Sequence, residues 1–265
     1  MFKELVMPGT SLGGLRPELV EEIGYDLEIV TPCTHDTGSA VLAVPANDDD
    51  FIYISSGTWS LMGVEMAKPD CSQESCDRNF TNEGGYNYRF RHLKNIMGLW
   101  MIQSVRHEYN DAYSFAEICD MAEEAKDFPS RVDANDNCFL SPDNMTEAVK
   151  EYCRNSGQPV PETLGELATV IYASLAECYA KTAQELEETT GRTYSRIHVV
   201  GGGSNAGYLN ELTARATGKE VHAGPGEATV IGNNTVQMLK AGEFATVEAD
   251  RDVIHESFGI KVYKA

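Results

Sequence analysis

Three short polar segments follow strand-forming residues, and their side chains could together perform phosphoryl transfer. The segments are His35-Asp36-Thr37, Ser56-Gly57-Thr58 and Gly201-Gly202-Gly203-Ser204-Asn205. The carboxylate of Asp36 can orient and deprotonate an attacking hydroxyl. Hydroxyl and amide groups around Thr58 can donate hydrogen bonds to terminal phosphates, and the glycine triplet can let a nucleoside lie against bare backbone. Such a reaction consists mostly of positioning and charge neutralisation, with Mg²⁺ bridging the phosphate oxygens.

The glycine triplet is the most informative of the three segments. The run Ile197-His198-Val199-Val200 predicts a short strand, the triplet ends it, and the apolar residues that follow recur at helical spacing. Strand, glycine turn and helix together can bring backbone N–H groups and a helix N-terminus against an anion or a nucleotide. An ordinary tight turn explains a lone glycine triplet equally well. The triplet is therefore evidence for a nucleotide site only together with the other two segments.

Asp36 has two further interpretations. The run Asp36-Thr37-Gly38-Ser39 also spells the active-site motif of aspartic proteases, in which two carboxylates share a proton. A single chain of that type needs a second such motif, which this sequence lacks, and the helix-rich remainder does not suit an all-β protease. Asp is also a frequent helix N-cap. Both roles are compatible with a helix that begins at the edge of a cleft.

Composition limits the class of protein. The chain has 265 residues, 42% of them hydrophobic, and a formal net charge of −20, which argues against a nucleic-acid or anionic-membrane partner. No apolar run approaches the ~20 residues that span a bilayer, and we expect no signal peptide. The seven cysteines are widely spaced, and Cys71 and Cys76 have no second pair with which to form a zinc site. We therefore predict a cytoplasmic protein with reduced thiols and no metal-binding residues of its own.

Hydrophobic periodicity predicts alternating strands and helices, which indicates an α/β fold. The predicted strands span residues 27–30, 51–55, 58–65, 197–200 and 220–223. The predicted helices span residues 17–23, 40–44, 93–105, 164–188, the stretch from the glycine turn to about 217, and a last helix near 227–241. Residues 66–88 predict a loop, and residues 110–165 predict a peripheral insertion with helical fragments near 114–125 and 143–155. Asn95 and Gln103 would share one face of the helix predicted over 93–105.

Taken in order, several blocks of this sequence resemble the C-terminal domain of the FGGY carbohydrate kinases. The blocks are His35-Asp36-Thr37-Gly38-Ser39-Ala40-Val41, the hairpin Ser55 to Gly63, Phe80-Thr81-Asn82-Glu83-Gly84-Gly85, Leu93 to Trp100 with Gln103, Val199 to Asn205, and Ala223 to Ala228. Each block is weak evidence alone, whereas the ordered set is specific. The third and fourth blocks favour the branch of the family that phosphorylates L-rhamnulose over the branches that use xylulose or glycerol.

The resemblance implies a ribonuclease-H-like (actin-like ATPase) α/β domain with a mixed sheet flanked by helices, and it also implies roles for single residues. Asp36 would be the catalytic base, with His35, Thr37 and Asn95 contacting the sugar. The residues implied at the ATP site are Thr58, Gln103, Gly201 and Gly202. The implied reaction transfers a phosphoryl group from ATP, with Mg²⁺, to a ketose sugar, giving L-rhamnulose 1-phosphate in rhamnose catabolism.

Members of this family have two lobes with the substrates in the cleft between them. The first lobe carries an Asp-x-Gly-Thr/Ser phosphate loop and much of the sugar site. Because Asp36 lies so near the start, we expect residues 1–265 to be the C-terminal domain, with the N-terminal kinase lobe missing. Two alternatives remain open: another FGGY kinase, of xylulose, fuculose or glycerol type, and a half-kinase that binds nucleotide without turnover.

Overall fold

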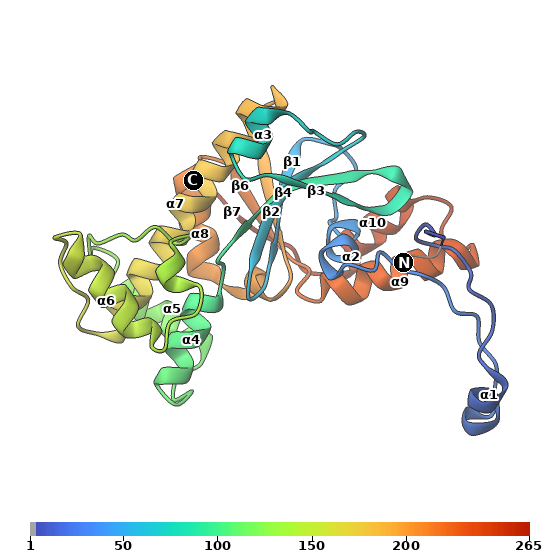
Figure 1. The fold of residues 1–265 in the computed structure, drawn as a ribbon, viewed down its shortest axis with the longest axis horizontal. Coiled ribbons are helices and arrows are strands. Elements are labelled where there is room, and N and C mark those ends of the chain that lie inside the picture. Colours follow the sequence, from blue (N-terminus) through green and yellow to red (C-terminus); the bar gives the residue numbers. More distant parts are fainter. Residues whose placement is uncertain (1–3) are drawn as a thin grey trace.

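A computed structural model describes residues 4–265 of the chain (Figure 1). The strands are β1 Phe51–Ser56, β2 Ser60–Met66, β3 Thr81–Gly84, β4 Phe90–Ile96, β5 Arg196–Val200, β6 Glu220–Ala223 and β7 Lys261–Tyr263. The α-helices are α1 Pro17–Ile23, α2 Asp36–Leu42, α3 Gln73–Asp77, α4 Trp100–Glu108, α5 Phe115–Glu124, α6 Met145–Asn155, α7 Leu164–Thr190, α8 Gly207–Thr217, α9 Ala228–Ala241 and α10 Val247–Ser257. Short 3₁₀ turns span Tyr86–Tyr88, Asn137–Phe139 and Gly202–Asn205.

The seven strands form one mixed sheet in the order β3-β4-β2-β1-β5-β6-β7. The pairs β1–β5 and β5–β6 are parallel, whereas the hairpin β1–β2 and all other pairs are antiparallel. Parallel neighbours need a crossover through other elements, and the long path from β2 to β5 includes α4 to α7. The carboxyl ends of β1 and β5 therefore lie at the same edge of the sheet.

Side-chain alternation along β1 explains why helices cover both faces of the sheet. Ile52 and Ile54 belong to the larger hydrophobic cluster, which also contains the buried side of α7. Phe51 and Tyr53 belong to the second cluster, together with residues of α2, α9 and α10. Because successive strand residues point to opposite faces, β1 is buried on both sides. Figure 1 shows α7 and α8 on one side of the sheet and α2, α9 and α10 on the other.

Helix α2, which begins at Asp36, is fixed at both its side and its end. A Cβ on Gly232 of α9 would lie 1.8 Å from the carbonyl oxygen of Ser39, so only glycine allows α9 to pack this closely on α2. Arg251 of α10 donates hydrogen bonds to three carbonyl oxygens at the end of α2 and just beyond it, those of Val41, Leu42 and Ala46. A cation at a helix C-terminus also suits the helix dipole. The position of Asp36 thus depends on contacts made by the last two helices.

The helix predicted over residues 93–105 is wrong in its first part. Residues 90–96 form β4, which pairs with β2 so that Asn95 lies opposite Leu61, and α4 begins only at Trp100. The apolar residues run on without a break from the strand into the helix, so periodicity did not reveal the boundary. Gly98, with φ +62°, makes the turn between the two elements. Asn95 and Gln103 consequently do not share a helix face.

Other element predictions also need correction. The segment predicted as a loop over 66–88 contains α3 and β3. Within the segment predicted as a strand over 27–30, only Val30 makes a bridge, to Ser11. The helix predicted over 40–44 begins earlier, at Asp36, and the N-cap of this helix is His35 rather than Asp36. The helix near 227–241 is not the last element, because α10 and β7 follow it. The remaining predicted strands and helices are present within a few residues of their predicted bounds.

Two segments extend from the body of the molecule. Residues 4–30, here called the N-terminal arm, reach away from the sheet, carry α1 at their far tip and return beside the outgoing part (Figure 1). The segment 110–165 lies at the opposite end, yet several of its residues, including Ile118 and Phe139, are fully buried in the larger core. Within residues 4–265, no helix has both the length and the apolar character needed to cross a membrane.

Candidate active site

The three polar segments named from the sequence meet around the tip of the β1–β2 hairpin. One cavity of about 430 Å³, the Asp36 cavity, is lined by residues of α2, the hairpin tip and β4. Its lining residues are His35, Asp36, Thr37, Ser55, Gly57, Thr58, Trp59, Leu61, Glu83 and Asn95. Five predicted site residues are therefore brought together, although they come from segments up to 60 positions apart in the sequence.

The carboxylate of Asp36 is held by its own helix terminus and opens to the cavity. Its Oδ1 accepts a hydrogen bond of 2.7 Å from the backbone N–H of Thr37, and its side chain is 76% exposed. Within residues 4–265, Oδ2 takes part in no hydrogen bond. Asp36 is the first residue of α2, so its carboxylate stands at the end of the helix where backbone N–H groups are free. A carboxylate with a free oxygen is suited to accept a proton from a bound hydroxyl.

Thr58 lies at the hairpin tip, and the beginning of α4 packs directly against it. The Thr58 hydroxyl donates a hydrogen bond of 3.3 Å to Oε1 of Gln103, and its carbonyl oxygen accepts one from the backbone N–H of Trp100. A Cβ on Gly98 would lie 2.5 Å from the backbone nitrogen of Ser60, so the approach of α4 to the hairpin requires glycine there. Gln103 and Thr58 thus form one polar contact between the two segments.

A second cavity of about 300 Å³, the Gly202 cavity, lies on the other side of the hairpin tip. Gly57 borders both cavities and separates them. Apart from Gly57, the lining residues are Leu99, Ile102, Gln103, Phe115, Cys119, Tyr172, Gly202, Asn205 and Ala206. A pocket with mostly apolar walls and a few polar groups is typical of sites for flat organic ligands. The structure thus separates Gln103 and Gly202 from the residues around Asp36.

The three glycines of the triplet have different tasks. A Cβ on Gly203 would lie 1.9 Å from Oγ of Ser56, and a Cβ on Gly201, where φ is +84°, would lie 2.9 Å from the Ser56 carbonyl oxygen. These two glycines therefore allow the turn to pack against the end of β1. A Cβ on Gly202 would meet nothing within 4 Å, so Gly202 is the member of the triplet that faces open space. Gly201 lines neither cavity.

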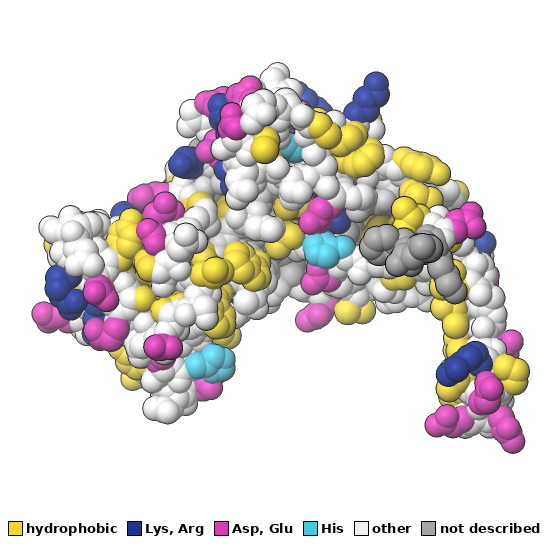
Figure 2. Space-filling view, viewed as in Figure 1, with side chains coloured by type: hydrophobic (Ala, Val, Ile, Leu, Met, Phe, Trp, Pro, Cys, Tyr) yellow, Lys and Arg dark blue, Asp and Glu magenta, His cyan; other side chains and the backbone are white. Residues whose placement is uncertain are grey.

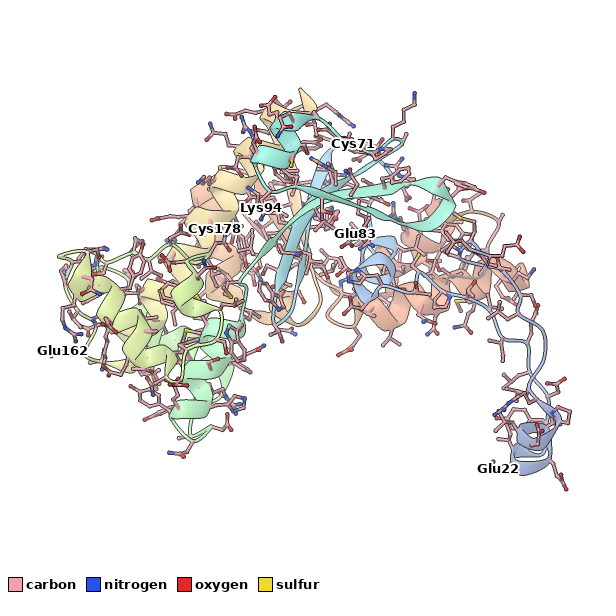
Figure 3. The ribbon with its side chains drawn as sticks, viewed as in Figure 1. Glu22, Cys71, Glu83, Lys94, Glu162 and Cys178 are labelled. Carbon is pink, nitrogen blue, oxygen red and sulfur yellow. The ribbon has the colours of Figure 1, made fainter. Side chains whose placement is uncertain are left out.

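A buried cation under the Asp36 cavity was not expected from the sequence. Arg91 of β4 is only 1% exposed, and its Nη2 lies 3.0 Å from Oε2 of Glu83, its cross-strand partner on β3. Figure 3 shows Glu83 on the side of the sheet nearer α2. Burial raises the pKa of the nearby Cys33 thiol to about 11, although Arg91 lowers it. The only available signal was the Thr81–Gly85 block, and its segment was interpreted as a loop.

A third cavity of about 570 Å³ lies beside the Asp36 cavity and shares Trp59 and Asn95 with it. An ion pair between Lys94 and Glu185 forms part of its wall, and Figure 3 shows Lys94 and Cys178 on the side nearer α7. Burial raises the pKa of the Cys178 thiol to about 11, so this sulfur stays protonated and is a poor nucleophile at neutral pH.

Among residues 4–265, no group of three or more His, Cys, Asp or Glu side chains is arranged so that it could hold a metal ion. A Mg²⁺ ion that arrives with a nucleotide needs no such cluster, because it keeps several waters and binds one or two carboxylates together with phosphate oxygens. The exposed Asp36 carboxylate at the cavity is compatible with that mode of binding.

Comparison with known proteins identifies the family. The family model described as "FGGY family of carbohydrate kinases, C-terminal domain" matches residues 52–241. A rhamnulokinase of Halalkalibacterium halodurans is 49% identical over 99% of this chain and 56% of its own length. A rhamnulokinase of Bacillus subtilis is 43% identical over 99% of this chain and 54% of its own length. The chain thus spans about half the length of the curated relatives it matches.

Solved structures confirm the predicted fold class. Plasmodium falciparum glycerol kinase with ADP gives a TM-score of 0.69 at 12% identity, covering 96% of this chain and 51% of that one. Ligand-bound xylulose kinase from Lactobacillus acidophilus gives 0.67 at 13% identity, covering 98% and 52%. The mixed sheet flanked by helices is the actin-like ATPase fold of these sugar kinases. With this fold, the match over residues 52–241 and the relatives of 43–49% identity, the chain belongs to the FGGY family of carbohydrate kinases.

Proposed function

We propose that this chain is the C-terminal part of an ATP-dependent sugar kinase that converts L-rhamnulose to L-rhamnulose 1-phosphate. The observation that carries the proposal is the pair of cavities on either side of the hairpin tip. One presents an exposed carboxylate among polar groups, and the other presents apolar walls and an open glycine. A phosphoryl transfer needs an acceptor site and a nucleotide site that meet at the terminal phosphate.

In this proposal the residues divide between the two cavities. Asp36 takes the proton from the attacking hydroxyl, while His35, Thr37 and Asn95 bind the sugar in the Asp36 cavity. The ATP-binding residues are Thr58, Gln103, Gly201 and Gly202. Thr58 at the border would meet the phosphates, Gly202 would face the nucleoside, and Gly201 would act through the shape of the turn. Bound Mg²⁺ would neutralise the phosphate charge.

The proposed acceptor follows from the curated relatives, which are rhamnulokinases and match 99% of this chain. The structural neighbours include kinases of xylulose and of glycerol, but at identities that carry only the fold. Other ketoses and polyols are therefore the acceptors against which L-rhamnulose must be compared.

Seven free cysteines, of which Cys71, Cys76 and Cys138 are exposed, support a reducing, cytoplasmic setting.

We further propose that residues 1–265 form one C-terminal domain, with 110–165 as an inserted helical segment, and that an N-terminal kinase lobe is its partner. The N-terminal arm exposes several large apolar side chains, among them Leu5 at 88% and Leu12 at 59%. Figure 2 shows hydrophobic side chains along this arm. Isolated exposed apolar residues are ordinary, but a row of them on a projecting arm is suited to pack against another domain.

Two measurements test the proposal in sequence. Calorimetry of the chain as it stands should show binding of Mg·ATP, and the Gly202 cavity is not a nucleotide site if no heat is detected at millimolar Mg·ATP. A chimera then joins the first part of the Halalkalibacterium relative to this chain, and ADP release is followed with L-rhamnulose, L-fuculose, D-xylulose and glycerol. We expect the highest kcat/KM with L-rhamnulose.

The chimera also separates the proposal from its alternatives. A higher kcat/KM with another acceptor would assign the chain to a different branch of the family. Binding of Mg·ATP without turnover of any acceptor by a folded chimera would favour the half-kinase that only binds nucleotide. Asp36→Asn in the same chimera is the control, because it keeps the size of the side chain and removes the base.

A further inference from the structure

The buried Arg91 and three side chains that line the Asp36 cavity, those of Glu83, His35 and Asp36, form a chain of contacts that the proposed roles do not explain. Arg91 Nη2 lies 3.0 Å from Glu83 Oε2, and Arg91 Nη1 makes a hydrogen bond of 3.4 Å with Nδ1 of His35. On the other side of the imidazole, Nε2 of His35 lies 3.6 Å from Oδ1 of Asp36. The buried guanidinium therefore reaches the proposed base through a single imidazole ring.

The direction of the hydrogen bond between Arg91 and His35 follows from chemistry. A guanidinium has five N–H donors, no acceptor, and a charge that is retained in proteins. Nδ1 of His35 must therefore be the acceptor, so it carries no proton. A neutral imidazole has one N–H, and that N–H must then be on Nε2. The ring consequently presents a donor toward Asp36 and the cavity.

One contact opposes this arrangement. Oε2 of Glu83 lies 3.2 Å from the same Nδ1, and the alternative tautomer would place an N–H between the two atoms. However, Glu83 Oε2 is buried and has no hydrogen-bond partner with suitable geometry among residues 4–265. Its contacts with His35 and Arg91 are thus ion-pair distances rather than aligned hydrogen bonds. Glu83 balances the charge of Arg91, while Arg91 makes the directed contact with the ring.

The buried position of Arg91 depends on its surroundings. A second hydrogen bond, from Nη2 to the carbonyl oxygen of Gly84, fixes the guanidinium plane. A Cβ on Gly38 of α2 would lie 3.3 Å from Nη2, so α2 leaves space for the guanidinium by having glycine at this position. Because a buried cation without its counter-charge is strongly destabilising, Glu83 and Arg91 act as one unit.

We propose that Arg91 is a positioning residue that holds His35 as the Nε2–H tautomer. His35 then acts as a hydrogen-bond donor in the cavity, toward a sugar oxygen or the Asp36 carboxylate. The tautomer is a property of this chain alone, whereas the contact with a sugar rests on the proposed function. Glu83 has the supporting role of compensating the charge of Arg91.

Imidazole ¹⁵N–¹H correlation spectra of the chain test the tautomer directly. They are recorded at about pH 8.5, two units above the usual histidine pKa of about 6.5, so that neutral rings can be compared. The variant His35→Gln identifies the His35 signals among those of the six histidines. We expect the wild-type chain to show the Nε2–H pattern. A wild-type Nδ1–H pattern, or an imidazolium at this pH, would overturn the proposal.

The paired variant Arg91→Gln/Glu83→Gln removes both charges together and should leave His35 as a mixture of tautomers. Arg89→Gln is the matched control, because Arg89 lies next to the same strand and pairs with Asp49 and Glu65 but not with His35. An unchanged Nε2–H signal in the paired variant would show that Arg91 does not set the tautomer. If that variant does not fold, Arg91→Lys serves instead, because its point charge cannot reproduce the fork of the guanidinium.

In the chimera described above, the paired variant should raise the KM for the sugar roughly tenfold, which corresponds to one weakened hydrogen bond. The KM for Mg·ATP should stay unchanged. Equal increases of both constants would indicate a general structural effect and would contradict the assigned role. Because the spectra need no turnover, failure of the tautomer test and failure of the kinase assay are distinguishable.

Discussion

The two cavities beside the hairpin tip differ in what surrounds them and in what lies beneath them. The Asp36 cavity has polar walls and stands above Arg91, a buried charge compensated by Glu83. The Gly202 cavity has mostly apolar walls, and none of its lining residues is charged. The Asp36 side therefore holds charged groups at fixed positions, whereas the Gly202 side offers an apolar surface for contact with a ligand. If the proposed function is correct, a single hairpin separates proton transfer from nucleotide binding.

The largest expected effect comes from the charge on the Asp36 side. In the chimera, Asp36→Asn should lower kcat by about 10²- to 10⁴-fold, the range for loss of a general base, because an amide cannot accept the proton. Binding of Mg·ATP, measured by calorimetry, should change little, since Asp36 does not line the Gly202 cavity. An unaltered kcat would remove Asp36 from the proton transfer. A parallel loss of nucleotide affinity would contradict the separation of the two cavities.

A steric change on the glycine side should have the next largest effect, on folding rather than on catalysis. Gly203→Ala places a Cβ 1.9 Å from Oγ of Ser56, and we expect a loss of about 3 kcal/mol or more in the free energy of unfolding. Urea denaturation of the chain measures it. Ser56→Gly in the Gly203→Ala background should recover part of the loss, because it removes the atoms that collide. If Gly203→Ala is as stable as the wild type, the close approach of the turn to β1 is not real.

The sequence predicts those structural features that are determined by neighbouring residues, and it does not predict those that depend on contacts between distant segments. The strand ending at Val200 and its glycine turn are local features, so their position was predicted correctly. The boundary between β4 and α4 was not, because it depends on pairing of Asn95 with Leu61 and on the turn at Gly98, which periodicity does not detect.

Contacts between distant segments were the hardest to predict. The pair of Glu83 with Arg91 exists only because β3 lies beside β4, and β3 is a short strand with partly exposed residues and little apolar alternation. The anchoring of α2 by Arg251 joins residues about 210 positions apart. Neither Arg91 nor Arg251 stands in a sequence pattern that indicates burial. A single sequence could therefore name the side chains that face the cavity but not the ones that hold them.

The buried His198 of β5, which packs edge-on against Phe51, gives a pH test of how the sheet is buried on the side of α2 and α10. Its folded-state pKa of about 3 lies below the usual value of about 6.5, so the unfolded chain binds the proton more readily. The contribution of His198 to the free energy of unfolding is therefore fully present above about pH 6.5 and is lost as the pH decreases toward 3. Between pH 7 and pH 5 this group should cost about 2 kcal/mol. The variant His198→Phe should lack this part of the pH dependence in urea denaturation.

The choice of pH range excludes the main competing groups. Carboxylates in the unfolded chain titrate near pH 4, below the range measured. Burial also lowers the pKa of His92, whose contribution remains in the His198 variant and cancels in the difference. Equal slopes for wild type and variant between pH 7 and pH 5 would show that His198 is not held neutral inside the protein.

The smallest expected effect separates ligand contact from packing within the glycine triplet. Gly202→Ala adds a Cβ that meets no protein atom within 4 Å, so the free energy of unfolding should stay within about 0.5 kcal/mol of the wild type. The same methyl group would stand where a nucleotide approaches the backbone and should weaken Mg·ATP binding roughly tenfold, or about 1.4 kcal/mol. Calorimetry and urea denaturation of Gly202→Ala and Gly203→Ala form a matched pair, because the two variants add one methyl group at adjacent positions. Unchanged affinity in Gly202→Ala would place the nucleotide elsewhere, whereas a loss of stability equal to that of Gly203→Ala would mean that all three glycines serve packing alone.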